Sequence, residues 1–170
     1  MFDLIILATL FDGPKHGYQL KREAGFIFGQ DDLHNNLVYP LLKKFTTEGW
    51  VTKKPTPGER GQTRQQYAIT ALGKKALLQR LTSFDEAETK SFEAFITRVG
   101  MFELLDPKAR IKIIAAREAY LLERLPKLAQ LHEKMDLGMY GGEVVGFLKE
   151  RIQSELTWIG RLGRMAGSEK

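Results

Sequence analysis

The sequence predicts a mostly α-helical protein, in which an α+β unit with a short hairpin is followed by a helical arm. Three observations lead to this fold class. Apolar residues recur at helical spacing along most of the 170 residues, the pattern changes to that of two short strands between residues 50 and 69, and the excess positive charge lies entirely before residue 85. Because 43% of the residues are hydrophobic, the chain can build a packed core.

Two helices are predicted at the start of the chain. Residues 2–11 form an apolar run, and Asp12-Gly13-Pro14 ends it with a turn signature. A second helix is expected over residues 15–28, with Tyr18 among the side chains available to face the core. The residues at 29–32 then interrupt this helix.

A third helix is predicted to begin at residue 34–37 and to end at Glu48, before Gly49. Its apolar residues form one buried stripe at helical spacing: Leu37, Val38, Leu41, Leu42 and Phe45. Its opposite face presents three polar side chains: Asn36, Tyr39 and Lys43. Pro40 fits such a helix only near the first turn, where backbone N–H groups have no intrahelical partner.

The pattern then changes to two strands, residues 50–54 and 64–69, which a turn-rich loop over residues 55–63 connects. Thr70 stands where an N-cap belongs and predicts that a fourth helix begins there. Three helices, a hairpin and a further helix are the elements of a winged helix-turn-helix, which we expect over residues 1–83.

The charge distribution favours a nucleic-acid partner for this half. Residues 1–84 carry twelve Lys/Arg and seven Asp/Glu, whereas residues 85–170 carry fourteen of each. Nine of the basic residues lie within residues 43–80. A basic segment beside a neutral one indicates a part that binds a polyanion, and an ordinary solvated surface is the alternative.

A third helix of this kind has the chemistry to enter the major groove of DNA. Amide and hydroxyl groups read base edges there, while lysines bind phosphates. In the predicted wing, Arg60 and Arg64 stand beside a glycine-containing tip that can reach the DNA backbone or the minor groove. Winged helices also serve as protein-interaction modules, so an assembly module or a non-specific nucleic-acid-binding module remains the alternative.

Several short motifs follow one another in this half of the chain. They are Gly13-Pro14-Lys15-His16-Gly17-Tyr18-Gln19-Leu20, Val38-Tyr39-Pro40-Leu41-Leu42-Lys43, Gly49-Trp50-Val51, Arg60-Gly61 through Arg64, Tyr67-Ala68-Ile69-Thr70, and Gly73. Together they resemble the PadR family of winged-helix transcriptional regulators, over about residues 3–82. The resemblance implies a DNA-binding domain in a dimeric repressor that a small molecule releases. Residues 33–37 depart from the family's usual small-hydroxyl or glycine-rich run, so no operator sequence is carried over.

The resemblance and the predicted surfaces together define the expected DNA contacts. Tyr39, Arg60 and Arg64 match the family positions that contact DNA most directly, and Lys43 and Lys44 match positions that are usually basic. The complete expected set is Lys15, Asn35, Asn36, Tyr39, Lys43, Lys44, Arg60, Thr63 and Arg64.

The second half, residues 84–170, predicts a C-terminal α-helical dimerisation domain. One amphipathic helix is expected over residues 84–105, and Asp106-Pro107 has the form of a cap and first-turn proline for the next helix. A heptad-like seam runs from Ile111 to Met135 in that helix, and Pro126 is expected to kink or divide it.

A glycine-rich break at Gly138 and Gly141-Gly142 precedes the last expected helix, over residues 143–165. Apolar helix faces outside a complete winged helix need a partner, and operator recognition pairs two half-sites. We therefore expect a homodimer, and folding of these helices back onto the first domain is the alternative. Tyr140 and Trp158 are candidates to line an inter-subunit pocket for a small apolar or phenolic effector, although such residues more often serve only packing.

Other functional classes receive little support from the sequence. The chain has no cysteine and three histidines on different predicted elements, so no catalytic constellation of nucleophile and base is apparent, and we expect no enzyme. Asp31, Asp32 and His34 lie close together, but the aspartates are better explained as a helix cap or as solvated residues, so we expect neither a metal site nor a cofactor. Without a signal peptide or a membrane-spanning run, the expected location is the cytoplasm.

Overall fold

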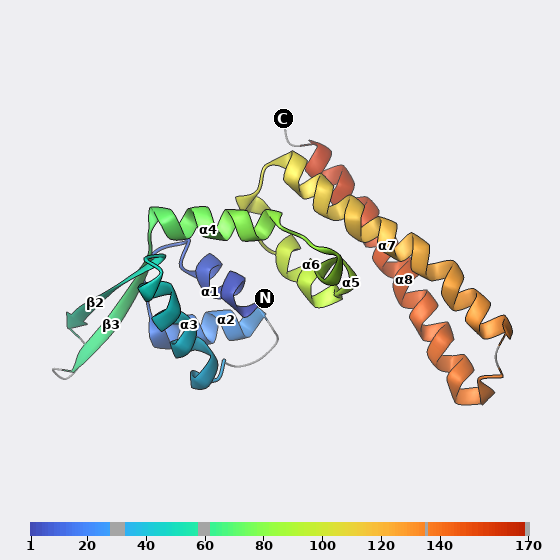
Figure 1. Cartoon of the computed structure of the whole chain (residues 1–170), viewed down its shortest axis with the longest axis horizontal. Helices are drawn as coiled ribbons and strands as arrows, with labels where there is room; N and C mark the ends of the chain where they lie inside the picture. Colours follow the sequence, from blue (N-terminus) through green and yellow to red (C-terminus); the bar gives the residue numbers. More distant parts are fainter. Residues whose placement is uncertain (28–32, 58–61, 135, 169–170) are drawn as a thin grey trace. The chain divides into compact units, whose positions relative to one another are not determined.

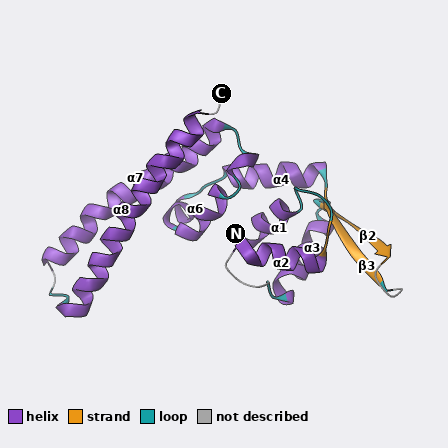
Figure 2. Ribbon diagram, turned by 180° about the vertical axis from the view of Figure 1, so that it is seen from behind, coloured by secondary structure: helices purple, strands orange, loops and turns teal. Residues whose placement is uncertain are grey.

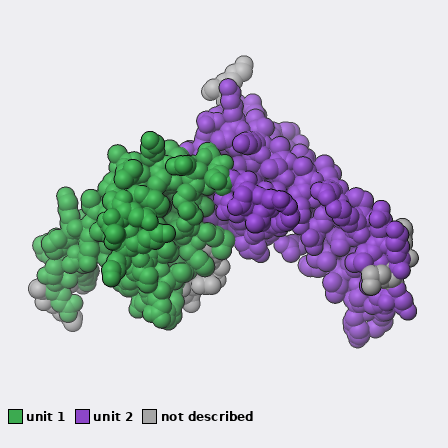
Figure 3. Space-filling model, in the orientation of Figure 1, with its two compact units in different colours: residues 1–83 green, residues 84–170 purple. Residues whose placement is uncertain are grey.

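The computed structural model describes residues 1–27, 33–57, 62–134 and 136–168. The chain divides into two compact units, Met1–Ser83 and Phe84–Lys170, which Figure 3 shows in different colours. Each unit has its own set of buried apolar side chains. No helix of the described part is long and apolar enough to span a membrane.

The N-terminal unit is a winged helix, as the order of its elements predicted (Figures 1 and 2). Its elements are α1 (Phe2–Thr9), β1 (Lys15–His16), α2 (Gly17–Ile27), α3 (Asn35–Thr47), β2 (Val51–Pro57), β3 (Thr63–Ile69) and α4 (Ala71–Thr82). The strands form one antiparallel sheet in the order β1-β3-β2, and the β2–β3 hairpin extends away from the helices as the wing.

The sheet is larger than the sequence pattern predicted. The strand β1 has only two residues, too few to show alternation, and it pairs with β3 so that Lys15 lies opposite Tyr67. The loop predicted over residues 55–63 is wrong at both ends, since Pro57 pairs with Thr63. Prolines are tolerated in β2 because it is an edge strand, in which half of the N–H groups point away from the sheet.

The core of the N-terminal unit is built around α1. Residues 4–7 of α1 are all buried, and Leu77 is buried in α4, which packs against α1. In α2, Leu20 and Ala24 are buried, whereas Tyr18, which we expected in the core, is 63% exposed. Residues two positions apart in a helix point about 200° from one another, so the burial of Leu20 turns Tyr18 outward.

The start of α4 is held tightly against the start of the wing. Thr70 is the N-cap, as predicted, and its Oγ1 accepts the N–H of Gly73 at 3.0 Å. The same hydroxyl is directed at the carbonyl oxygens of Gly49 (2.7 Å) and Trp50 (3.1 Å). A Cβ on Gly73 would lie 2.1 Å from the Trp50 carbonyl oxygen, so only glycine fits there.

The described residues of the C-terminal unit form helices and short connections. The elements are α5 (Glu86–Lys90), α6 (Phe92–Val99), the 3-10 helix η2 (Phe102–Leu104), α7 (Pro107–Lys134) and α8 (Gly138–Ser168). The single helix predicted over residues 84–105 is therefore wrong. Asp85 and Ser91 each start a separate helix there, because their side chains accept the backbone N–H groups of Glu88 (2.8 Å) and Ala94 (3.1 Å).

The helices α7 and α8 form a long antiparallel hairpin (Figures 1 and 2). The predicted cap at Asp106 is confirmed, since its carboxylate accepts the N–H of Ala109 at 2.9 Å. We expected Pro126 to kink or divide this helix, and the division is wrong, because α7 continues through it. Both Pro126 and Leu122, four residues earlier, are exposed, so water can bond the carbonyl that the proline leaves without a partner.

The last helix begins earlier than predicted. It starts at Gly138, which has the positive φ of +61°, and not at residue 143. Gly141 and Gly142 therefore lie inside α8 and do not break the chain. The sharp change of direction needs only the one glycine with left-handed backbone.

Buried apolar side chains recur every seven residues on both α7 and α8, which pack against each other. In α7 the repeat comprises Ile114, Leu121 and Leu128, and in α8 it comprises Val145, Ile152, Ile159 and Ala166. This confirms the middle of the predicted heptad-like seam. The predicted first member, Ile111, is instead 46% exposed, and Ile113 is buried.

Candidate nucleic-acid interface

The helix α3 presents polar side chains to solvent. Val38, Leu42 and Phe45 are buried, which directs the opposite face of α3 outward. Five of the expected DNA contacts are exposed on this helix: Asn35, Asn36, Tyr39, Lys43 and Lys44. Amide, hydroxyl and ammonium groups on one exposed helix provide both kinds of contact that a DNA groove requires, to base edges and to phosphates.

A histidine caps the start of α3. His34 Nδ1 accepts the backbone N–H of Asn36 at 3.2 Å. Asp31 and Asp32, which we expected to cap this helix or to lie in solvent, are outside the described residues. Pro40 lies inside α3 at an exposed position, beyond the first turn where we expected it. Within the described ranges, no three His, Cys, Asp or Glu side chains come together as metal ligands.

The wing contributes further cations. Thr63 and Arg64 of β3 are exposed, and Lys53 and Lys54 of β2 are exposed on the neighbouring strand. The pairing of β2 with β3 holds the wing together near these residues. Thr56 Oγ1 also donates a hydrogen bond to the Arg64 carbonyl oxygen at 3.2 Å. Arg60, the other expected contact in the wing, lies outside the described residues.

Two of the expected lysines already have acidic partners. Lys15 Nζ lies 2.9 Å from Glu23 Oε2, and the Lys15 side chain is only 18% exposed. Lys44 Nζ lies 3.9 Å from Glu48 Oε1 on the surface of α3, a separation at which an exposed pair contributes little. A phosphate can therefore recruit Lys44 more easily than Lys15, which has to give up or share a shorter ion pair.

Sequence reasoning missed two exposed groups on α2. The Arg22 guanidinium lies 5.8 Å from the centre of the Tyr18 ring, and both side chains are exposed. They add a hydroxyl and a cation to the surface of the helix that precedes α3. The burial of Leu20 and Ala24 at helical spacing is the signal that places Tyr18 outside the core.

The two aromatic residues expected in an effector pocket do not share a cavity within one chain. Trp158 lines a groove of about 660 Å³ between α6 and α8, with Phe92, Ile96 and Phe147 among its other lining residues. Tyr140 is 79% exposed and is not among them. The two residues lie on one continuous helix, 18 positions and therefore about 27 Å apart, which separates them.

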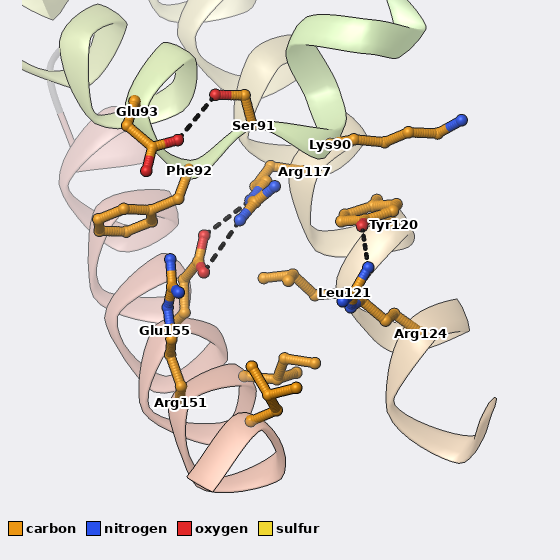
Figure 4. A pocket seen from close by; sticks show the side chains of 12 residues that line it. Lys90, Ser91, Phe92, Glu93, Arg117, Tyr120, Leu121, Arg124, Arg151 and Glu155 are labelled. Atoms are coloured by element: carbon orange, nitrogen blue, oxygen red, sulfur yellow. Dashed lines mark hydrogen bonds and ion pairs between the residues drawn. The ribbon is translucent and has the colours of Figure 1, made fainter. Parts of the chain in front are cut away.

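A second, polar cavity of about 290 Å³ lies between the α5–α6 junction, α7 and α8 (Figure 4). Arg117 and Glu155 meet in its wall through two hydrogen bonds, Nε–Oε1 at 2.7 Å and Nη2–Oε2 at 3.1 Å. Arg117 also donates to the Thr89 carbonyl oxygen at 2.7 Å. At the rim, the pKa of Glu93 is lowered by its own backbone N–H and by the Ser91 hydroxyl. The buried pair thus connects three helices.

Comparison with known proteins gives a family for the N-terminal unit. Residues 6–79 match the model of the transcriptional regulator PadR-like family. Among the curated proteins, no match was found. The match includes α3, the wing and all of the sequence motifs from Gly13 to Gly73.

Several solved structures are similar to this chain. Protein TA0346 of Thermoplasma acidophilum is 35% identical over 46% of this chain and 75% of its own, with a TM-score of 0.43. Bacillus subtilis PadR in complex with operator DNA is 22% identical over 96% of this chain and 98% of its own, with a TM-score of 0.47. The same protein in complex with p-coumaric acid is 20% identical over 98% of both chains, with a TM-score of 0.43. The motifs and the family match together show that the chain belongs to the PadR-like family of transcriptional regulators.

Proposed function

We propose that the chain is a cytoplasmic, sequence-specific DNA-binding transcriptional repressor that acts as a homodimer. The observation that carries the proposal is the exposed polar face of α3, set opposite the buried side chains Val38, Leu42 and Phe45. The buried face fixes the helix on its unit, so the outer face is presented as one rigid surface. Each subunit places α3 in the major groove of one half-site, and the wing lies along the flanking backbone.

The residues divide into two roles. Asn35, Asn36 and Tyr39 read base edges, because amides and a phenol can both donate and accept hydrogen bonds. Lys43 and Lys44 bind phosphates and supply affinity without sequence preference. The wing set, Thr63, Arg64 and Arg60, together with Lys15, completes the phosphate contacts.

The dimer uses an exposed apolar face of α8. Its four residues are each more than half exposed: Met139, Tyr140, Val144 and Phe147. Positions 140, 144 and 147 repeat at helical spacing on one face, away from Val145 and Ile152, which pack toward α7. A continuous apolar face of this kind is expected to be covered, and a second copy of the same helix is the partner we propose.

A small apolar or phenolic effector releases the repressor from DNA. The groove beside Trp158 is the site we propose for it, since it lies between helices of the dimerisation unit and carries three aromatic side chains. The effector shifts DNA affinity only if it binds the non-operator conformation more tightly. The similarity to a structure of Bacillus subtilis PadR with p-coumaric acid suggests the ligand class to screen first.

Fluorescence anisotropy tests the proposal, with the chain's own upstream DNA and a scrambled duplex over a series of salt concentrations. We expect a preference of at least about a thousandfold for the upstream DNA. Tyr39→Ala should weaken binding to that duplex more than to the scrambled one. Lys43→Ala should weaken both and reduce the salt slope by about 1, whereas the exposed Lys112→Ala in α7 serves as the matched control.

Equal, weak and steeply salt-dependent binding to both duplexes would contradict operator recognition. That result would support the alternative, a winged helix that serves protein assembly or binds nucleic acid without sequence preference. Sedimentation of the protein alone reports separately on the homodimer, and Phe147→Lys in α8 should convert it to monomer.

A further inference from the structure

The ring of Tyr39 rests on Gly17. Gly17 is buried where β1 ends and α2 begins. A Cβ built on Gly17 would lie 3.0 Å from Tyr39 Cε1 and 3.2 Å from Tyr39 Oη, closer than ordinary van der Waals contact. Gly17 has none of the positive φ angles found at Gly13 and Gly49. At this position the Tyr39 ring, and not the backbone conformation, therefore opposes a larger side chain.

A second tyrosine lies within electrostatic range of the first. Tyr67 in β3 is only 6% exposed, and its partner across the sheet is Lys15, two residues before Gly17. Burial raises the pKa of Tyr67, and the nearby phenol of Tyr39 raises it further. Tyr39 itself is 44% exposed, so one part of its ring is held by the protein and another part faces solvent.

We propose that Gly17 acts as a positioning residue, against which the Tyr39 ring is held in one orientation before DNA binds. The inference rests on the proposed function, because it takes Tyr39 as the residue that reads the operator. A side chain already fixed in its bound orientation loses less conformational entropy on binding than a mobile one.

This arrangement gives Gly17 an influence on base recognition without contact to DNA. Gly17 belongs to the start of α2 and not to α3. A substitution at Gly17 changes how Tyr39 is presented while the lysines of α3 keep their places. Specific binding should therefore weaken, and binding to the phosphate backbone should not.

A double-mutant cycle in the free protein tests the packing without DNA. Gly17→Ala should lower the urea midpoint in the parent chain, because the new methyl group meets the Tyr39 ring. In a Tyr39→Ala background the ring is absent, so Gly17→Ala should have no further cost. Gly163→Ala is the matched control, since nothing lies within 4 Å of its Cβ position in α8. An equal cost of Gly17→Ala in both backgrounds would overturn the proposal.

Should Gly17→Ala alone fail to fold while the double variant folds, the cycle still supports the proposal. Aromatic NMR of the folded parent chain then tests the packing directly: cross-peaks between the Tyr39 ring protons and the Gly17 Hα protons are expected. Their absence would overturn the proposal.

The DNA-binding experiment measures how strongly each variant prefers the upstream duplex over the scrambled one. Gly17→Ala should weaken upstream binding roughly two- to tenfold, the range expected for releasing one ordered side chain, with scrambled binding unchanged. Equal loss on both duplexes would overturn the positioning role. If the parent chain shows no preference while the stability cycle shows coupling, the proposed function fails and the packing of Tyr39 on Gly17 is upheld.

Discussion

The buried ion pair between α7 and α8 leads to a prediction about the free energy of unfolding. The Arg117 and Glu155 side chains are 4% and 5% exposed and meet through two hydrogen bonds. Removing one partner leaves the other charge buried, which costs about 3–5 kcal/mol. We expect Glu155→Gln to lower the free energy of unfolding by an amount in this range, because the amide keeps the shape of the carboxylate but removes its charge and one of the two oxygens that accept from Arg117.

The assay is urea denaturation followed by helical circular dichroism, at one protein concentration for all variants because the unfolding of the proposed dimer would depend on that concentration. The matched control is Glu123→Gln, which removes a carboxylate from the exposed pair with Lys127 and should leave the transition unchanged. Replacing both buried partners, as Arg117→Met with Glu155→Leu, should restore most of the lost stability.

A cost below about 1 kcal/mol for Glu155→Gln, the level typical of exposed pairs, would refute the reasoning. It would mean that water reaches the pair in solution. A double replacement that is less stable than Glu155→Gln would also contradict it, since the apolar side chains leave no unpaired charge.

Three further predictions concern the winged-helix unit, each measured by urea denaturation. Thr70→Ala removes the N-cap of α4 and should cost about 0.5–2 kcal/mol, while Thr70→Ser should retain most of the stability. Gly73→Ala should prevent the native packing of α4 against the wing, because its Cβ would lie 2.1 Å from the Trp50 carbonyl oxygen; near-parental stability would show that the contact is absent. Burial alone would raise the pKa of Asp3, but the Met1 ammonium and the Arg80 guanidinium outweigh it and hold the pKa below 3.8. A lowered folded pKa stabilises the protein above the unfolded pKa, so the stability difference between the parent and Asp3→Asn should be present at neutral pH and shrink as the pH falls below 3.8; a difference independent of pH would contradict this.

Local patterns were sufficient to predict the parts of the fold that local interactions determine. The apolar stripe of α3 fixes which face turns outward, so the exposure of Tyr39 and Lys43 follows from the sequence alone. Thr70 and Asp106 are caps because their side chains bond N–H groups three residues later, an interaction that needs no distant partner.

Features that depend on distant residues were not predictable in this way. The strand β1 exists only because β3 lies beside it, and Arg117 finds Glu155 across 38 positions of sequence. Lys15 was expected to contact DNA because of its place in the motif that resembles the family, while its ion pair with Glu23 depends on the geometry where β1 meets α2.

Other errors came from competition between local signals. Ser91 has a side chain that caps a helix, and this interaction divided a segment whose apolar spacing predicted one continuous helix. Glycines at 141 and 142 suggested a break, but the single left-handed residue Gly138 already provides it. Because α8 runs unbroken from Gly138, Tyr140 and Trp158 of one chain are about 27 Å apart, and a pocket that they line between two subunits stays a prediction.

The central claim is that α3 enters the major groove of two half-sites in one dimer. Methylation protection of guanine N7 on the upstream DNA tests it most directly, because this atom lies only in the major groove. We predict two protected patches with centres about 10 base pairs apart, or a multiple of that spacing, and their loss in Tyr39→Ala. Binding that leaves every guanine N7 reactive, or a pattern that Tyr39→Ala does not change, would contradict the claim.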